Sequence, residues 1–156
     1  MYTNAKRLSP VSSKTKPAGS KTKKDDFESA FRGLREMMKP CDKKLWVTKD
    51  KPGEYMSESK SLRYLGKPLM FASITTKSYV AFHLFPVYMF PNLLDGISPE
   101  LKKRMQGKTC WNFKKAEEPL FEELGKVVEA SLRRFEEMGK RDLNREDAQA
   151  LWGKGK

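Results

Sequence analysis

The 156-residue sequence contains few of the residue types that form redox or metal centres. It has one histidine, His83, and two cysteines, Cys41 and Cys110, which form neither a CxxC pair nor a metal-ligand spacing. No apolar stretch approaches the ~20 residues that cross a bilayer, and no apolar run near the N-terminus is typical of a signal peptide. These absences predict a reduced, cytoplasmic protein with no cofactor, no metal and no membrane partner.

Acidic residues are absent from residues 1–24, although seven of the 32 Lys and Arg residues lie there: Lys6, Arg7, Lys14, Lys16, Lys21, Lys23 and Lys24. The segment is otherwise rich in Ser, Thr and Pro, so ordering it would bury little apolar surface. We therefore expect a disordered basic arm over residues 1–24. Of the net charge of +12, only +3 belongs to residues 25–138. Any nucleic acid is accordingly expected to bind through the arm, weakly and without sequence preference.

Hydrophobic periodicity after the arm predicts a helix followed by two hairpins. Asp25 or Asp26 is the expected helix cap, and apolar residues recur at helical spacing from Phe27 until Pro40 ends the helix. The segments LWVTK and EYMSES then flank the turn DKPG, which places Pro and Gly where a hairpin turn requires them.

The second predicted hairpin, PLMFASIT with SYVAFHLF, has apolar residues on both faces of its second strand. Val80, Phe82 and Leu84 alternate with Tyr79, Ala81, His83 and Phe85. A strand with one solvent-exposed face would carry polar residues at alternate positions. This strand is therefore expected to be central in the sheet, with its second face covered or lining a hollow. The sequence predicts a ligand pocket formed by Tyr79, His83, Phe85, Tyr88 and Trp111. Trp111 belongs to it only if its side chain does not face the opposite side of the sheet.

The remaining sequence predicts two helices and one strand. Ser98 caps a short helix, SPELKKRM, the segment TCWNFK alternates as a strand, and a long amphipathic helix runs from Pro119 to Met138. Residues 139–156 form a polar tail with a possible short helix around residues 145–152. The expected fold is a single α+β domain over residues 25–138, with an antiparallel sheet of about five strands and the first and last helices on one face.

Three groups of residues are candidates for a catalytic, metal-binding or base-stacking role. His83 could act as a general base and Cys110 as a nucleophile, but no sequence motif supplies a partner, so structural roles are favoured. Glu117, Glu118, Glu122 and Glu123 could bind a hard cation, although acids at a helix N-terminus also complement its dipole. No catalytic residue is predicted. The aromatic run could stack on bases, but residues 78–96 contain no Lys or Arg.

The segments TKDKPGEYMSES and KSYVAFHLFPVYMFPNLLDGISPELKKRMQGKTCWNF resemble the YdhG-like family of bacterial domains of unknown function, over about residues 25–138. The resemblance implies an α+β fold with an antiparallel sheet and, for a distant branch, a frataxin-like iron-chaperone role. Such a role needs an acidic ridge, whereas residues 25–138 have a net positive charge.

The sequence therefore predicts a non-enzymatic module that binds a small ligand or a protein. The alternatives are a frataxin-like iron-binding chaperone, weak nucleic-acid binding through the arm, and an enzyme with His83 beside Tyr88 or Cys110.

Overall fold

A computed structural model describes residues 22–152, with the exception of the side chain of Trp152. Residues 1–21 of the predicted basic arm therefore lie outside the described residues. In chain order the elements are α2 (Lys23–Met38), η3 (Lys39–Lys44), β1 (Leu45–Lys51), β2 (Glu54–Tyr64), β3 (Lys67–Thr76), β4 (Val80–Leu84), α3 (Pro86–Met89), η4 (Pro91–Leu94), α4 (Pro99–Lys103), β5 (Met105–Gln106), β6 (Cys110–Phe113), α5 (Glu118–Met138), β7 (Arg141–Leu143) and α6 (Arg145–Trp152).

The fold is α+β, as the sequence predicts, and is built on one sheet of seven strands in the order β1-β2-β3-β4-β6-β5, with β7 paired to β2. All pairs along this path are antiparallel, and β7 runs parallel to β2. The predicted number of about five strands is too low because β5 and β7 contain two and three residues. Such strands are too short to show the alternation that identifies a strand in a sequence.

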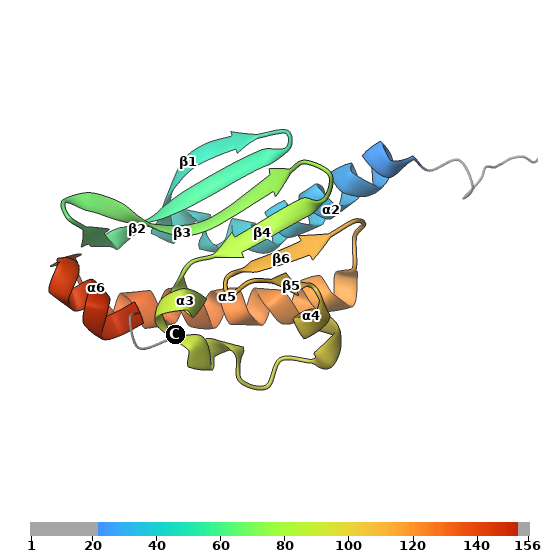
Figure 1. The fold of residues 1–156 in the computed structure, drawn as a ribbon. Coiled ribbons are helices and arrows are strands. Elements are labelled where there is room, and N and C mark those ends of the chain that lie inside the picture. Colours follow the sequence, from blue (N-terminus) through green and yellow to red (C-terminus); the bar gives the residue numbers. More distant parts are fainter. Residues whose placement is uncertain (1–21, 153–156) are drawn as a thin grey trace, which may run out of the picture.

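The long helices α2 and α5 both lie behind the sheet in Figure 1, and none of the described helices crosses its front face. The central position of β4 is confirmed, because β3 and β6 flank it. Val80, Phe82 and Leu84 point to the helices and are fully buried, whereas Ala81 and His83 on the other face are half-buried. The core therefore lies between the sheet and the two helices, and within residues 22–152 no helix covers the opposite face of β4.

The helix α2 begins earlier than the sequence predicts. Its cap is Thr22, whose hydroxyl accepts from the backbone N–H of Asp25, while the Asp25 carboxylate accepts from the backbone N–H of Thr22. Asp25 is thus the third residue of a capping box and does not cap the helix itself. Lys23 and Lys24, which the sequence assigns to the arm, form the first turn of α2.

The segment predicted as a polar tail continues the fold beyond residue 138. Gly139, with φ of +71°, follows the end of α5. β7 then pairs with residues 62–64 of β2, and Leu143 is buried with only 1% of its surface exposed. The short helix α6 lies in the predicted position, so residues 139–152 contain structure that polar composition did not reveal.

Candidate functional site

The structure places the five residues of the predicted pocket at several locations. His83 faces away from the helices and pairs across the sheet with Cys110, whereas Trp111 pairs with the core residue Phe82 and is completely buried. Phe85 and Tyr88 lie after β4, with ring centroids 6.0 Å apart. Tyr79 precedes β4 and lines a separate hollow near β6. The fold does not bring Trp111 into contact with the open face that carries His83.

His83 and Cys110 occupy environments that favour their neutral forms. The Nδ1 atom of His83 lies 3.0 Å from the hydroxyl of Thr109, and burial lowers the pKa of the imidazole. The Sγ atom of Cys110 donates to the side-chain oxygen of Asn112 at 3.4 Å, and burial raises the pKa of the thiol. A protonated thiol is a poor nucleophile, so the geometry supports the structural roles that the sequence favoured.

Two of the four carboxylates at the start of α5 bind different partners, and the other two line a groove. Glu117 accepts two hydrogen bonds of 2.7 Å from Arg104, and Glu123 accepts from the backbone N–H and the hydroxyl of Ser98 at 2.6 and 2.7 Å. Glu118 and Glu122 line a groove of about 700 Å³ between α2 and α5. Within residues 22–152, no group of three or more His, Cys, Asp or Glu side chains is close enough together to hold a metal ion.

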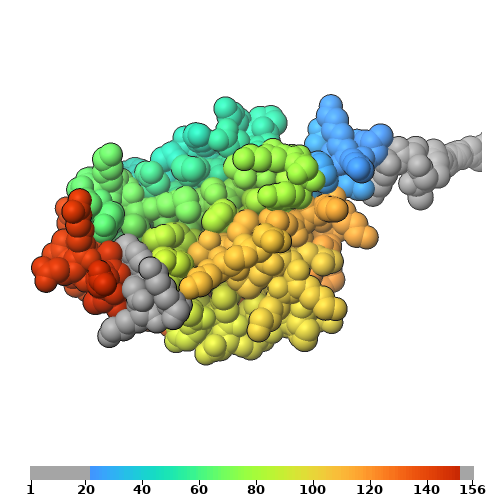
Figure 2. Space-filling model, in the orientation of Figure 1, coloured from blue at the N-terminus to red at the C-terminus, as the bar shows by residue number. Residues whose placement is uncertain are grey.

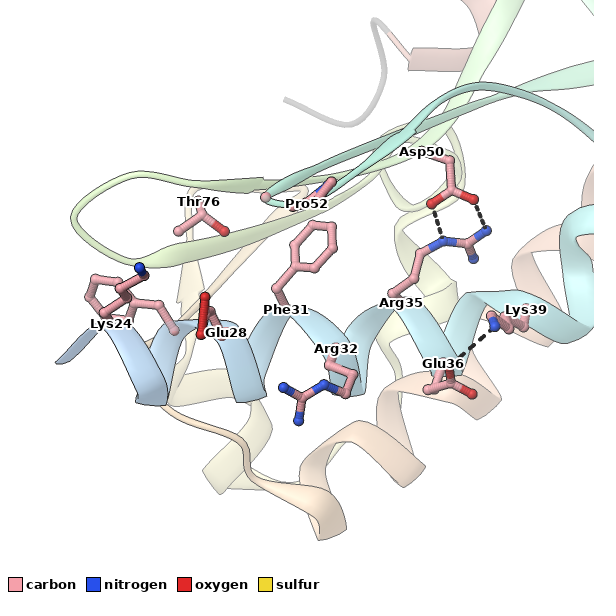
Figure 3. Close-up of a pocket in the computed structure, with 12 residues that line it drawn as sticks. Lys24, Glu28, Phe31, Arg32, Arg35, Glu36, Lys39, Asp50, Pro52 and Thr76 are labelled. Atoms are coloured by element: carbon pink, nitrogen blue, oxygen red, sulfur yellow. Dashed lines mark hydrogen bonds and ion pairs between the residues drawn. The ribbon is translucent and has the colours of Figure 1, made fainter. Parts of the chain in front are cut away.

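A larger hollow, of about 830 Å³, lies between α2 and the turn that joins β1 to β2 (Figure 3). Phe27 and Phe31 form its apolar wall on α2, and Pro52 of the turn lies opposite Phe31. Lys24 and Glu28 add charged groups near the start of the helix, and Thr76 closes the side formed by β3. The hollow thus combines an apolar wall with charged groups at both ends, because Arg35, Asp50, Glu36 and Lys39 line it on the other side of Phe31.

Arg35 links the walls of this hollow. Its Nε and Nη2 atoms donate to the two carboxylate oxygens of Asp50 at 2.9 and 2.8 Å, and Nη2 also donates to Asp42 at 2.6 Å. The guanidinium carbon lies 4.3 Å from the centre of the Tyr55 ring, whose hydroxyl donates to Asp42 at 3.1 Å. These contacts raise the pKa of Arg35 and lower that of Asp50, mainly through the hydrogen bonds between them.

Two buried polar atoms beside this hollow have no hydrogen-bond partner within the described part of the chain. They are Nη1 of Arg35, a residue with 9% of its surface exposed, and Oγ1 of Thr76. Buried polar groups are normally satisfied, either by the protein or by a bound molecule or water. Their position is consistent with a site that a polar group can enter.

Sequence reasoning did not find this hollow, although it identified both of its walls. The helical stripe with Phe27 and Phe31 and the DKPG turn were each predicted. The sequence contains no signal that this turn folds over α2. The turn is linked to α2 by the ion pair between Arg35 and Asp50, and these two residues are 15 positions apart. Such a pair has no local spacing by which it could be recognised.

Comparisons with protein-family models, with curated proteins and with solved structures found no match to this chain. The resemblance to YdhG-like domains therefore stays a prediction from the quoted motifs. No helix within residues 22–152 is both long enough and apolar enough to span a membrane.

Proposed function

We propose that this domain is a binding module that holds a small amphiphilic molecule in the hollow between α2 and the β1–β2 turn. The observation that carries the proposal is an apolar wall with charged groups at both of its ends in a hollow of about 830 Å³. That volume lies in the range of about 300–1,000 Å³ typical of small-molecule sites, which are mostly apolar with a few polar groups.

The side chains of the hollow define the class of ligand. An aromatic or branched aliphatic body fits against Phe27, Phe31 and Pro52, since burying apolar surface is favourable by about 25 cal/mol per Å². Lys24 offers a cationic donor and Glu28 an acceptor at the same end. The ligand would therefore carry an anionic or acceptor group beside a donor, as an amino acid derivative or an aromatic hydroxy acid does.

The pocket predicted around Tyr79, His83, Phe85, Tyr88 and Trp111 remains a separate prediction. His83 and Trp111 lie on opposite faces of the sheet, so one ligand cannot contact both without rearranging the core. The hollow at α2 requires no such rearrangement, and for this reason we favour it as the binding site.

The proposal is tested with anilinonaphthalene sulfonate, a probe that has aromatic rings and one anionic group. Titration of the full chain, followed by its fluorescence and by amide proton–nitrogen spectra, should shift the signals of Phe31, Gly53 and Thr76, which line the hollow. Phe27→Ala should weaken binding by about tenfold because it removes part of the apolar wall.

The matched control is Met37→Ala, which truncates a half-buried side chain of the same helix in the groove between α2 and α5. Circular dichroism establishes that each variant is folded. A probe that shifts only Met37 and Gly125, or that binds the Phe27 and Met37 variants equally well, contradicts the proposal.

A further inference from the structure

A third hollow, of about 470 Å³, lies where β6 and the end of α4 meet the loop before β4. Tyr79 is half-buried in its wall, and the exposed lysines Lys103, Lys114 and Lys115 surround it. Arg104 also lines the hollow, where two hydrogen bonds to Glu117 fix its guanidinium and raise its pKa. The surface around the tyrosine therefore has a net positive charge.

The acids in this hollow offset only part of its positive charge. Glu117 is paired with Arg104 at 2.7 Å, which leaves Asp26 as the acidic side chain opposite the three lysines. Potentials from neighbouring like charges add over a Debye length of about 8 Å, so these lysines act together on an anion in the hollow.

Three elements distant in the sequence create this arrangement. Residues 78–96 contain no Lys or Arg, which argued against base stacking on the aromatic run. The fold brings Lys103 from α4 and Lys114 and Lys115 from the segment after β6 to the hollow that Tyr79 also lines. The cations that a stacking surface needs are thus present in space but absent from the neighbouring sequence.

The start of α2 lies beside the same hollow, because Asp26 in its first turn lines it. Figure 2 shows the surfaces of the first residues of α2, of the loop before β4 and of β6 next to one another on one face. The chain ahead of α2 adds five cations, at positions 6, 7, 14, 16 and 21, with no acid among them.

We propose that Tyr79 and the lysines around it form a binding site for single-stranded nucleic acid. A base stacks on the exposed part of the Tyr79 ring, phosphates bind Lys103, Lys114 and Lys115, and the side-chain amides of Gln106 and Asn112 lie in the same hollow to bond the base or sugar. A duplex would offer only phosphates to this site, because its bases are already stacked. The proposal is independent of the amphiphile site at α2.

The test is the binding of a fluorescein-labelled oligothymidylate of about 12 nucleotides to the full chain, followed by anisotropy at several salt concentrations. Tyr79→Leu should weaken binding about fivefold or more, while Tyr79→Phe should retain most of the affinity because it keeps the ring. The double variant Lys114→Gln/Lys115→Gln should reduce the slope of log K against log salt by about 1.4.

The control is Lys67→Gln/Lys140→Gln, which removes the same charge at exposed positions outside the hollow and should leave the slope almost unchanged. Circular dichroism separates loss of binding from loss of folding, and the Phe variant tests the ring if Leu is not tolerated. The proposal is overturned if the full chain does not bind at low salt, or if both double variants change the slope equally. It is also overturned if oligoglutamate binds as tightly as the oligonucleotide, since the hollow would then select only negative charge.

Discussion

At the scale of single residues, Arg35 joins parts of the chain that the sequence does not connect. Its guanidinium bonds Asp42 in η3 and Asp50 in β1, and it stacks on Tyr55 in β2. An arginine that binds two carboxylates and an aromatic ring holds three elements in one geometry. The hollow at α2 depends on this geometry, since Asp50 precedes the turn that covers it.

We expect Arg35→Met to lower the free energy of unfolding by about 2 kcal/mol, because it removes charge-assisted hydrogen bonds from a buried position. Arg32→Met, one turn earlier at an exposed position, is the control and should change stability by less than about 0.5 kcal/mol. Urea unfolding measures both. Equal effects of the two substitutions would show that the network contributes little.

The ion pair between Arg35 and Asp50 also predicts how the stability difference between the wild type and Arg35→Met depends on pH. The hydrogen bond from Arg35 lowers the pKa of Asp50 below the ordinary value of 3.8, so the ionised carboxylate stabilises the folded state above that pH. This contribution is lost as the pH falls through the lowered pKa of the folded state. The difference between the wild type and Arg35→Met should therefore stay constant from pH 7 to about pH 5 and narrow as the pH falls below 3.8.

At the scale of elements, the contact between α2 and α5 depends on a glycine. A Cβ atom added to Gly33 would lie 2.6 and 2.8 Å from two ring carbons of Phe121. That ring is buried and packs edge-on against Phe113, with centroids 4.9 Å apart, so it has little room to move. Gly33 thus allows the two helices to approach one another closely.

Gly33→Ala should destabilise the protein by about 1–2 kcal/mol, because overpacking outweighs the gain in helix propensity of about 1 kcal/mol. Gly125→Ala is a matched control on the facing helix, where an added Cβ meets only the Cγ of Met37 at 3.4 Å. The control should be neutral or stabilise by up to about 1 kcal/mol. Thermal and urea unfolding of both variants test the pair, and a stabilised Gly33→Ala would refute the packing argument.

At the scale of the whole molecule, residues 139–152 belong to the folded unit. We expect Leu143→Ala to lower the free energy of unfolding by about 2–3 kcal/mol, since this leucine is 1% exposed. Leu65→Ala is the control at a neighbouring position with 50% exposure and should cost less than about 0.5 kcal/mol. A small effect at Leu143, measured by urea unfolding, would mean that the segment is the polar tail that its composition suggested.

The sequence predicted the long elements of this fold, the strand β6 and the short helices α4 and α6, but not the two shortest strands, β5 and β7. The apolar residues of α2, α5 and the two hairpins recur over enough positions to identify each element and its buried face. β5 and β7 are strands only because a neighbour offers backbone partners, and no local pattern marks them. The candidate sites were hardest to predict for the same reason, since Lys114 and Tyr79 meet only through the order of strands in the sheet.

The parallel pairing of β7 with β2 has a consequence for how the protein is made. The backbone groups of residues 62–64 face β7, which is synthesised only after α5, so these groups lack that partner while the chain emerges from the ribosome. An unpaired strand edge invites association with other chains, and partly folded chains expose such edges. The exposed Arg63 lies within that edge, where a charged side chain hinders pairing between molecules until β7 has been added.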